Sequence, residues 1–134
     1  FQSYNLIPHQ TVLENVQLAL TLSGISKDER RKRAKEVIAK VGLGDQINKK
    51  PSEMSGGEKQ RIAVARALIN RPDVILADEP SGSLDSHNKE ELYKLFFTLR
   101  EKLDQTFVII THDESLSKMT DRSIRLVDGM ITTF

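Results

Sequence analysis

The spacing of apolar residues divides the chain into a helical first half and a second half that mixes helices with strands. In the first half, apolar side chains recur every three or four residues, which is typical of helices with one buried face. Helices are predicted at about 12–22, 27–41 and 58–69. A residue suited to capping precedes the first two, at Thr11 and Ser26, and Ser26 and Glu29 have capping-box spacing.

The apolar pattern changes at Val74, where a short continuous apolar run begins. Val74–Ala77 is typical of a strand that is buried on both faces. The elements predicted after it are a helix at 86–103, a strand at 106–111, a short helix near 115–119 and a hairpin at 124–133. A strand, a crossover helix and a second apolar strand predict a right-handed unit with parallel strands, hence an α/β fold.

Composition and charge narrow the function classes. The 134 residues carry a net charge of +1, so no bulk field indicates a nucleic-acid or membrane-surface binder. The basic run at 30–33 is interpreted as a solvated helix face, because acidic residues lie close to it. No cysteine is present, which excludes disulfides, zinc fingers and thiol catalysis. No apolar stretch is long enough for a membrane helix, and the first residues have no signal-peptide pattern.

Candidate chemistry follows each of the two predicted strands. Asp78 and Glu79 come after the first strand, and His112 follows the second. Because the carboxyl ends of parallel strands share one edge of a sheet, these side chains are expected to lie close together. An aspartate there can hold Mg²⁺, and a glutamate can orient or deprotonate water. The alternative is an ordinary acidic turn beside a surface histidine.

Three further segments are weaker candidates. Ser55-Gly56-Gly57-Glu58 opens the third helix, where unpaired N–H groups favour an anion and glycines permit close approach of a phosphate. The alternative there is a simple N-cap. Ser81–Asp85 is a polar loop that can equally be a helix cap at Asp85 or Ser86. Gln2 is a neutral amide that can contact Mg²⁺ or water.

In their order along the chain, these segments resemble the motifs of the ATP-binding cassette (ABC) ATPases. The resemblance extends from residue 1 to the terminal hairpin. The matching segments are Phe1-Gln2 for the Q-loop, Met54–Arg61 for the signature sequence, Val74–Pro80 for the Walker B strand, Ser81–Asp85 for the D-loop and His112 for the switch histidine.

This resemblance implies an α/β fold of two parts. Residues 1–72 would form the Q-loop and a helical subdomain that carries the signature sequence. Residues 73–134 would form the C-terminal part of a P-loop NTPase (RecA-like) core with parallel strands.

The resemblance also implies ATP and Mg²⁺ as cofactors, and a role for each candidate residue. At the strand ends, Asp78 would hold Mg²⁺, Glu79 would be the general base, and His112 would contact the γ-phosphate. Gln2 would sense Mg²⁺ and the attacking water. The residues expected at the composite site with a second ATPase subunit are Ser55, Gly56, Gly57 and Glu58 of the signature sequence and Asp85 at the dimer interface.

Local details indicate a subgroup. Met54 stands where Leu is usual in the family and Glu58 where Gln is usual. The Ser-Gly-Gly-Glu form, with segments 11–16 and 77–85, looks most like the ATPase of lipoprotein-releasing systems. The implied partners are a second ATPase subunit and an inner-membrane transport subunit, with no nucleic acid. The implied location is cytoplasmic, peripheral at the inner face of the cell membrane.

The phosphate-binding loop Gly-x-x-x-x-Gly-Lys-Ser/Thr does not occur in the 134 residues. In this family that loop precedes the Q-loop, with which the chain starts. A fragment that lacks the front of the core is therefore expected, and this chain alone is expected neither to bind ATP tightly nor to hydrolyse it. The alternatives are a non-enzymatic fold fragment and a piece of a soluble ABC protein of DNA repair or translation.

Overall fold

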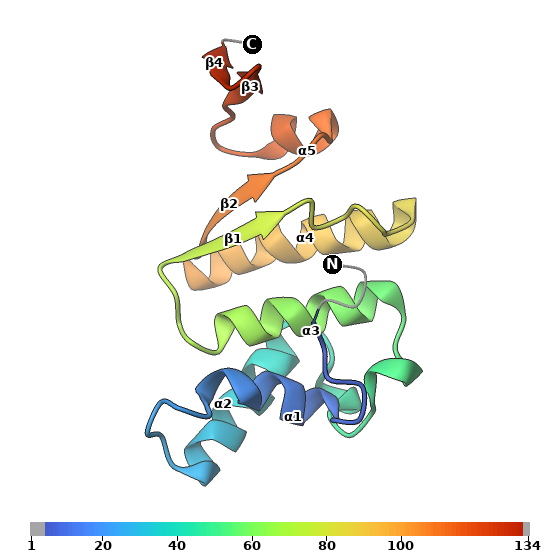
Figure 1. Ribbon diagram of the computed structural model, residues 1–134, viewed down its shortest axis with the longest axis vertical. Coiled ribbons are helices and arrows are strands. Elements are labelled where there is room, and N and C mark those ends of the chain that lie inside the picture. Colours follow the sequence, from blue (N-terminus) through green and yellow to red (C-terminus); the bar gives the residue numbers. More distant parts are fainter. Residues whose placement is uncertain (1–4, 133–134) are drawn as a thin grey trace.

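The computed structural model describes residues 5–132, and it places a layer of helices beside a two-stranded parallel sheet (Figure 1). Helix α4 packs against the sheet and also contacts α3 of the helical layer, and the C-terminal hairpin lies at the opposite end of the molecule from α1 and α2. Gln2, the predicted Q-loop residue, lies outside the described residues.

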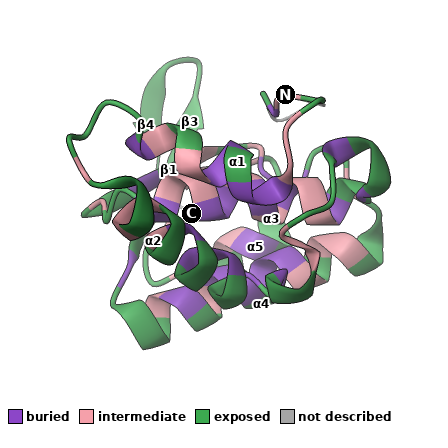
Figure 2. Cartoon of the chain, turned by 90° about the horizontal axis from the view of Figure 1, so that it is seen from below, coloured by how far each residue is buried: buried purple, intermediate pink, exposed green. Residues whose placement is uncertain are grey.

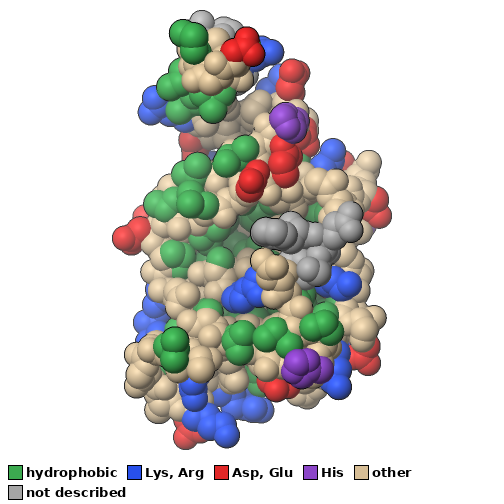
Figure 3. Space-filling view, in the orientation of Figure 1, with side chains coloured by type: hydrophobic (Ala, Val, Ile, Leu, Met, Phe, Trp, Pro, Cys, Tyr) green, Lys and Arg blue, Asp and Glu red, His purple; other side chains and the backbone are tan. Residues whose placement is uncertain are grey.

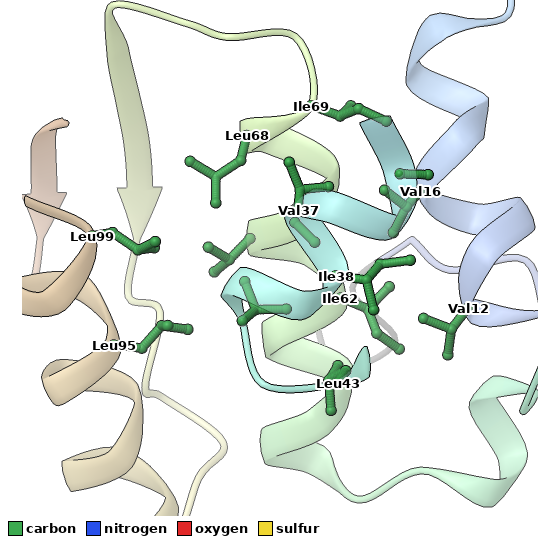
Figure 4. Packing of buried hydrophobic residues seen from close by; sticks show 14 of the residues in the cluster. Val12, Val16, Val37, Ile38, Leu43, Ile62, Leu68, Ile69, Leu95 and Leu99 are labelled. Carbon is green, nitrogen blue, oxygen red and sulfur yellow. The ribbon is translucent and has the colours of Figure 1, made fainter. Parts of the chain in front are cut away.

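The helical layer consists of α1 (Val12–Gln17), α2 (Lys27–Lys40) and α3 (Gly56–Leu68). Three short 3-10 helices stand between them: η1 (Leu18–Leu20), η2 (Gly44–Gln46) and η3 (Pro51–Glu53). Their apolar faces meet in one core, shown in Figure 4, whose best buried members include Val12, Val16, Ile38, Ile62 and Ile69. The helical period seen in the sequence thus marks the buried faces.

Polar caps begin these helices, as the sequence predicts. The Thr11 hydroxyl accepts a hydrogen bond from the Glu14 N–H. In the other direction, the Thr11 N–H donates to the Glu14 carboxylate, which completes a capping box. Ser26 accepts from the Glu29 N–H, but the Glu29 carboxylate pairs with Arg33 at 3.4 Å. The spacing at Ser26 therefore gives one half of a capping box.

The sheet is formed by β1 (Val74–Asp78) and β2 (Thr106–Ile110), joined by α4 (Ser86–Leu103). The strands are parallel, with Val74 opposite Thr106 and Asp78 opposite Ile110, which confirms the predicted crossover unit. The Phe96 and Phe107 rings, 4.9 Å apart, pack α4 onto the sheet.

The prediction that the strand at Val74–Ala77 is buried on both faces is wrong for the described residues, and the second strand is open on the same face. Ile75 faces the core, but Leu76 is 78% exposed, Val108 is 49% exposed and Ile110 is 62% exposed. These residues alternate with buried or half-buried ones because successive strand side chains point to opposite faces. Helix α4 covers one face, and no element within residues 5–132 covers the other.

The chain ends with α5 (Glu114–Met119) and a hairpin of β3 (Arg125–Val127) and β4 (Met130–Thr132). The antiparallel hairpin turns at Asp128 and Gly129, both with positive φ, as predicted from that dipeptide. Buried positions gather along α1, α3 and α4 rather than in the hairpin, whose strands are exposed (Figure 2). Within the described residues, no helix has both the length and the apolarity to cross a membrane.

The predicted domain boundary at residue 72 falls in the connection between α3 and β1. Contacts cross from one predicted part to the other: Arg61 Nη2 on α3 lies 3.8 Å from the Glu91 carboxylate on α4. The division into two subdomains therefore stays a prediction.

Candidate functional site

The candidate residues Glu79 and His112 lie together at the carboxyl edge of the sheet. The Glu79 backbone N–H donates to the Ile110 carbonyl at 2.8 Å, which continues the strand pairing by one residue. The His112 Nε2 atom lies 3.3 Å from Glu79 Oε1. The histidine side chain is 99% exposed, so both groups are open to a ligand from solvent.

Glu79 has an unusual backbone. Its φ is 45°, in the left-handed region that a residue with a Cβ adopts at a cost of about 1–2 kcal/mol. Its own carbonyl accepts from the Gly82 N–H at 3.1 Å, so the chain turns sharply directly after the strand. The turn holds the carboxylate at the strand end instead of along the strand.

Asp78 ends β1 on the exposed face of the sheet, and it makes no ion pair with any described residue. Residues 5–132 contain no cluster of three or more His, Cys, Asp or Glu that could hold a metal. Mg²⁺ is usually held by one or two carboxylates together with water and substrate phosphates. The single open carboxylate of Asp78 fits that donor set. On the surface in Figure 3, acidic side chains and a histidine stand beside exposed hydrophobic side chains.

A buried hydrogen-bond network lies behind this edge. The Tyr93 hydroxyl on α4 donates to Asp113 Oδ2 at 2.7 Å and lies 2.8 Å from Ser81 Oγ. Burial, together with the neighbouring Asp113 carboxylate, raises the pKa of Tyr93 to about 12, so the hydroxyl keeps its proton at neutral pH. Hydrogen bonds from Ser115 and Tyr93 hold the pKa of Asp113 well below its usual range.

Tyr93 was not among the residues predicted from the sequence. Its signal is a hydroxyl on the apolar face of the helix at 86–103, next to Leu92, where a buried tyrosine needs a hydrogen-bond partner.

The segment Ser55–Glu58 forms the N-terminal cap of α3. Ser55 Oγ accepts from the Glu58 N–H at 3.1 Å, and the Ser55 N–H donates to Glu58 Oε1 at 2.9 Å. The hydrogen bond from the Ser55 N–H to the Glu58 carboxylate lowers the pKa of Glu58. The first N–H groups of a helix have no acceptor within it, so those of Gly56 and Gly57 suit an anion.

Gly57 also has a packing role that the sequence did not show. A Cβ on Gly57 would lie 2.6 Å from Asn88 Oδ1 and 3.3 Å from Asn88 Cβ, so a larger residue there requires Asn88 to move or α3 and α4 to separate.

Asp85 is the N-cap of α4, where its carboxylate accepts from the Asn88 N–H at 2.8 Å. Of the two caps considered from the sequence, Asp85 or Ser86, the structure has the first. A Cβ on Gly56 would lie 3.6 Å from Leu84, so the loop at 81–85 adjoins the start of α3. The capping role of Asp85 and a role at a dimer interface are compatible, because the residue is exposed.

Two solved structures resemble the fold closely. The dimeric structure of MJ0796, a bacterial ABC transporter cassette, superimposes with a TM-score of 0.80 at 44% identity, over 99% of this chain and 59% of that one. A post-hydrolysis state of the ATP-binding cassette MJ0796 bound to ADP and Pi gives a TM-score of 0.79 at 43% identity, with the same coverage. The fold is therefore that of the α/β P-loop NTPases, as predicted.

A family profile described as "ABC transporter" matches residues 1–82. The chain belongs to the ABC transporter family. It is 60% identical, over 98% of its length, to the lipoprotein-releasing system ATP-binding protein LolD of Bacteroides thetaiotaomicron. The match covers 60% of that relative, so the chain spans about three fifths of the length of the curated relatives that it matches.

Proposed function

We propose that the chain is part of the ATP-binding subunit of an ABC transporter that couples ATP binding and hydrolysis to lipoprotein release or a related export. The observation that carries the proposal is the Glu79–His112 pair at the carboxyl edge of the parallel sheet. Its support is the 60% identity to a lipoprotein-releasing ATP-binding protein over nearly the whole chain.

In this proposal the residues at the sheet edge act on the γ-phosphate, which ATP supplies for transfer to water. Glu79 orients the attacking water and accepts its proton, as a general base within hydrogen-bond reach can do. His112, 3.3 Å from Glu79, contacts the phosphate. Asp78 would hold Mg²⁺, which would neutralise phosphate charge, and Gln2 would sense the metal and the attacking water. Positioning and charge stabilisation supply most of the catalysis in such reactions.

The signature segment would complete the site of a second subunit. Ser55 and the N–H groups of Gly56 and Gly57 would bind the γ-phosphate of ATP held mainly by that subunit, while Glu58 keeps the cap in place. Asp85 would cross the dimer interface. Support comes from the exposure of Ser55 and Gly56 at the start of α3 and from the dimeric state named for the similar MJ0796 cassette.

The assembly would include an inner-membrane transport subunit, docked on the helical layer. The ATP-binding subunit would then be cytoplasmic and peripheral at the inner face of the cell membrane. Co-purification with the membrane subunits of a lipoprotein-releasing system tests this arrangement. Recovery with a soluble repair or translation complex instead would contradict it.

The hydrolytic role is tested with two proteins: the 134-residue chain, and a chimera in which it replaces the matching stretch of the Bacteroides thetaiotaomicron relative. We expect MgATP hydrolysis by the chimera and none by the chain alone, which has no P-loop sequence. Glu79→Gln should lower kcat of the chimera by at least about 100-fold, because the general base is lost. Glu90→Gln, an exposed glutamate on α4, is the matched control. Equal turnover in the Glu79 variant would overturn the assignment.

A further inference from the structure

One buried hydroxyl connects the two loops that carry the candidate catalytic pair. Ser81, which lies two residues after Glu79, contacts the Tyr93 hydroxyl at 2.8 Å. Asp113, which directly follows His112, accepts a bond from the same hydroxyl at 2.7 Å. Ser81 and Tyr93 are both buried, at 8% and 5% exposure, so water competes little for these bonds.

The contact between Glu79 and His112 contributes little to holding these two side chains in place. The His112 side chain is 99% exposed, and an ion pair between solvated groups contributes little free energy. The position of His112 therefore depends on its neighbours in the chain. Asp113 is fixed on both sides: its N–H donates to Thr111 Oγ1 at 2.9 Å, and its carboxylate caps α5 by accepting from the Ser115 and Leu116 N–H groups.

The loop after Glu79 is fixed in a similar way. The Leu84 N–H donates to the Ser81 carbonyl at 3.1 Å, and the Gly82 N–H donates to the Glu79 carbonyl. Both bonds stabilise a turn that starts from the left-handed backbone of Glu79. Ser81 is the buried residue of this turn whose side chain reaches α4, through Tyr93.

We propose that Tyr93 is a positioning residue, whose hydroxyl holds the loop after Glu79 and the loop of His112 in one fixed arrangement. The inference rests on the proposed function as far as it concerns hydrolysis. The hydrogen bond to the Asp113 carboxylate is charge-assisted and therefore among the stronger kinds. The link itself is a property of the fold and can be tested without ATP.

The first test measures backbone hydrogen exchange in the 134-residue chain and in its Tyr93→Phe variant, which keeps the ring and removes the hydroxyl. We expect exchange about tenfold faster at the amides of Gly82 and Leu84 and also at Asp113 and Ser115, since one buried bond to each loop is lost. Amides of α2 should be unchanged. Ser123→Ala, which removes a hydroxyl bonded to the Ser117 carbonyl, is the matched control.

The second test uses steady-state hydrolysis by the chimera. Tyr93→Phe should lower kcat about tenfold and leave KM for ATP within about twofold, because small misplacement of catalytic groups affects the chemical step more than binding. If the unaltered chimera does not hydrolyse ATP, the proposed function fails while the exchange test still decides the link. The inference would be overturned if exchange in Tyr93→Phe were unchanged, were faster at one loop only, or were equally faster in all helices. An unchanged kcat of Tyr93→Phe in an active chimera would also overturn it.

Discussion

At the scale of single residues, Asn15 shows how one buried amide holds a loop. Its side chain is 1% exposed and accepts from the Ile7 N–H at 2.8 Å. Its amide group donates to the carbonyls of Ile7, Gln10 and Thr11. These bonds fix the segment at 7–11, which follows the predicted Q-loop, onto α1.

Removing this amide should destabilise the chain. Asn15→Ala leaves buried backbone groups without partners, and the free energy of unfolding should fall by about 2 kcal/mol. Urea unfolding followed by circular dichroism measures the change. Asn48→Ala, at an exposed position, should stay within about 0.5 kcal/mol of the unaltered chain. Equal stabilities of the two variants would contradict the role given to Asn15.

The Asp113 carboxylate makes stability depend on pH. Hydrogen bonds from Ser115 and Tyr93 hold its pKa below the usual 3.8 in the folded chain. A depressed folded pKa contributes stability that is present above the unfolded pKa and is lost as pH falls through the folded value. The stability difference between the unaltered chain and Asp113→Asn should therefore be largest at neutral pH and shrink towards about pH 3. Urea unfolding across that range measures it. A difference that grows towards acid would contradict the assignment, and Asp45→Asn serves as the exposed control.

At the scale of elements, the contact between α3 and α4 depends on the absence of a side chain at Gly57. An alanine Cβ there would lie 2.6 Å from Asn88 Oδ1, so the helices must separate or Asn88 must move. We expect Gly57→Ala to lower the free energy of unfolding by about 1–3 kcal/mol. Gly56→Ala meets only ordinary contact with Leu84 at 3.6 Å and should cost less than about 1 kcal/mol. Asn88→Ala should restore most of the loss in the Gly57 variant, and no restoration would show that the contact is not the cause.

The sequence was informative about elements because their signals are local. Thr11 and Ser55 mark helix starts, and the apolar period of α4 predicts its full extent, Ser86–Leu103. The parallel strands and the proximity of Glu79 to His112 follow from the crossover rule. Burial was predicted less well, because whether Leu76 is covered depends on which elements pack on the sheet and not on the strand itself. Tyr93 and Asn15 were missed since their roles depend on partners that are distant or irregular in the sequence.

At the scale of the whole molecule, the open face of the sheet is an exposed apolar surface that no described element covers. Val74, Leu76, Val108 and Ile110 are all exposed on it. Contiguous exposed apolar side chains and open strand edges favour association.

We therefore expect the 134-residue chain to associate as its concentration rises, above the 15.2 kDa of one copy. Sedimentation velocity at several concentrations measures this. The double variant Leu76→Thr with Ile110→Thr should shift the distribution towards one copy, because the apolar area of the face falls while strand propensity is kept. Leu22→Thr, at an isolated exposed leucine, should leave it unchanged. A chain of constant single-copy mass would contradict the expectation.

At Glu79 the residue that is best for stability differs from the residue that the proposed chemistry needs, because its backbone is left-handed. Glycine adopts a φ of 45° without the steric cost that a Cβ imposes, so Glu79→Gly should raise the free energy of unfolding by about 1 kcal/mol, whereas Glu79→Gln should not. A screen for thermal resistance alone would therefore favour replacement of the proposed general base. Selection for turnover would retain a glutamate at this position, whereas selection for stability alone would not.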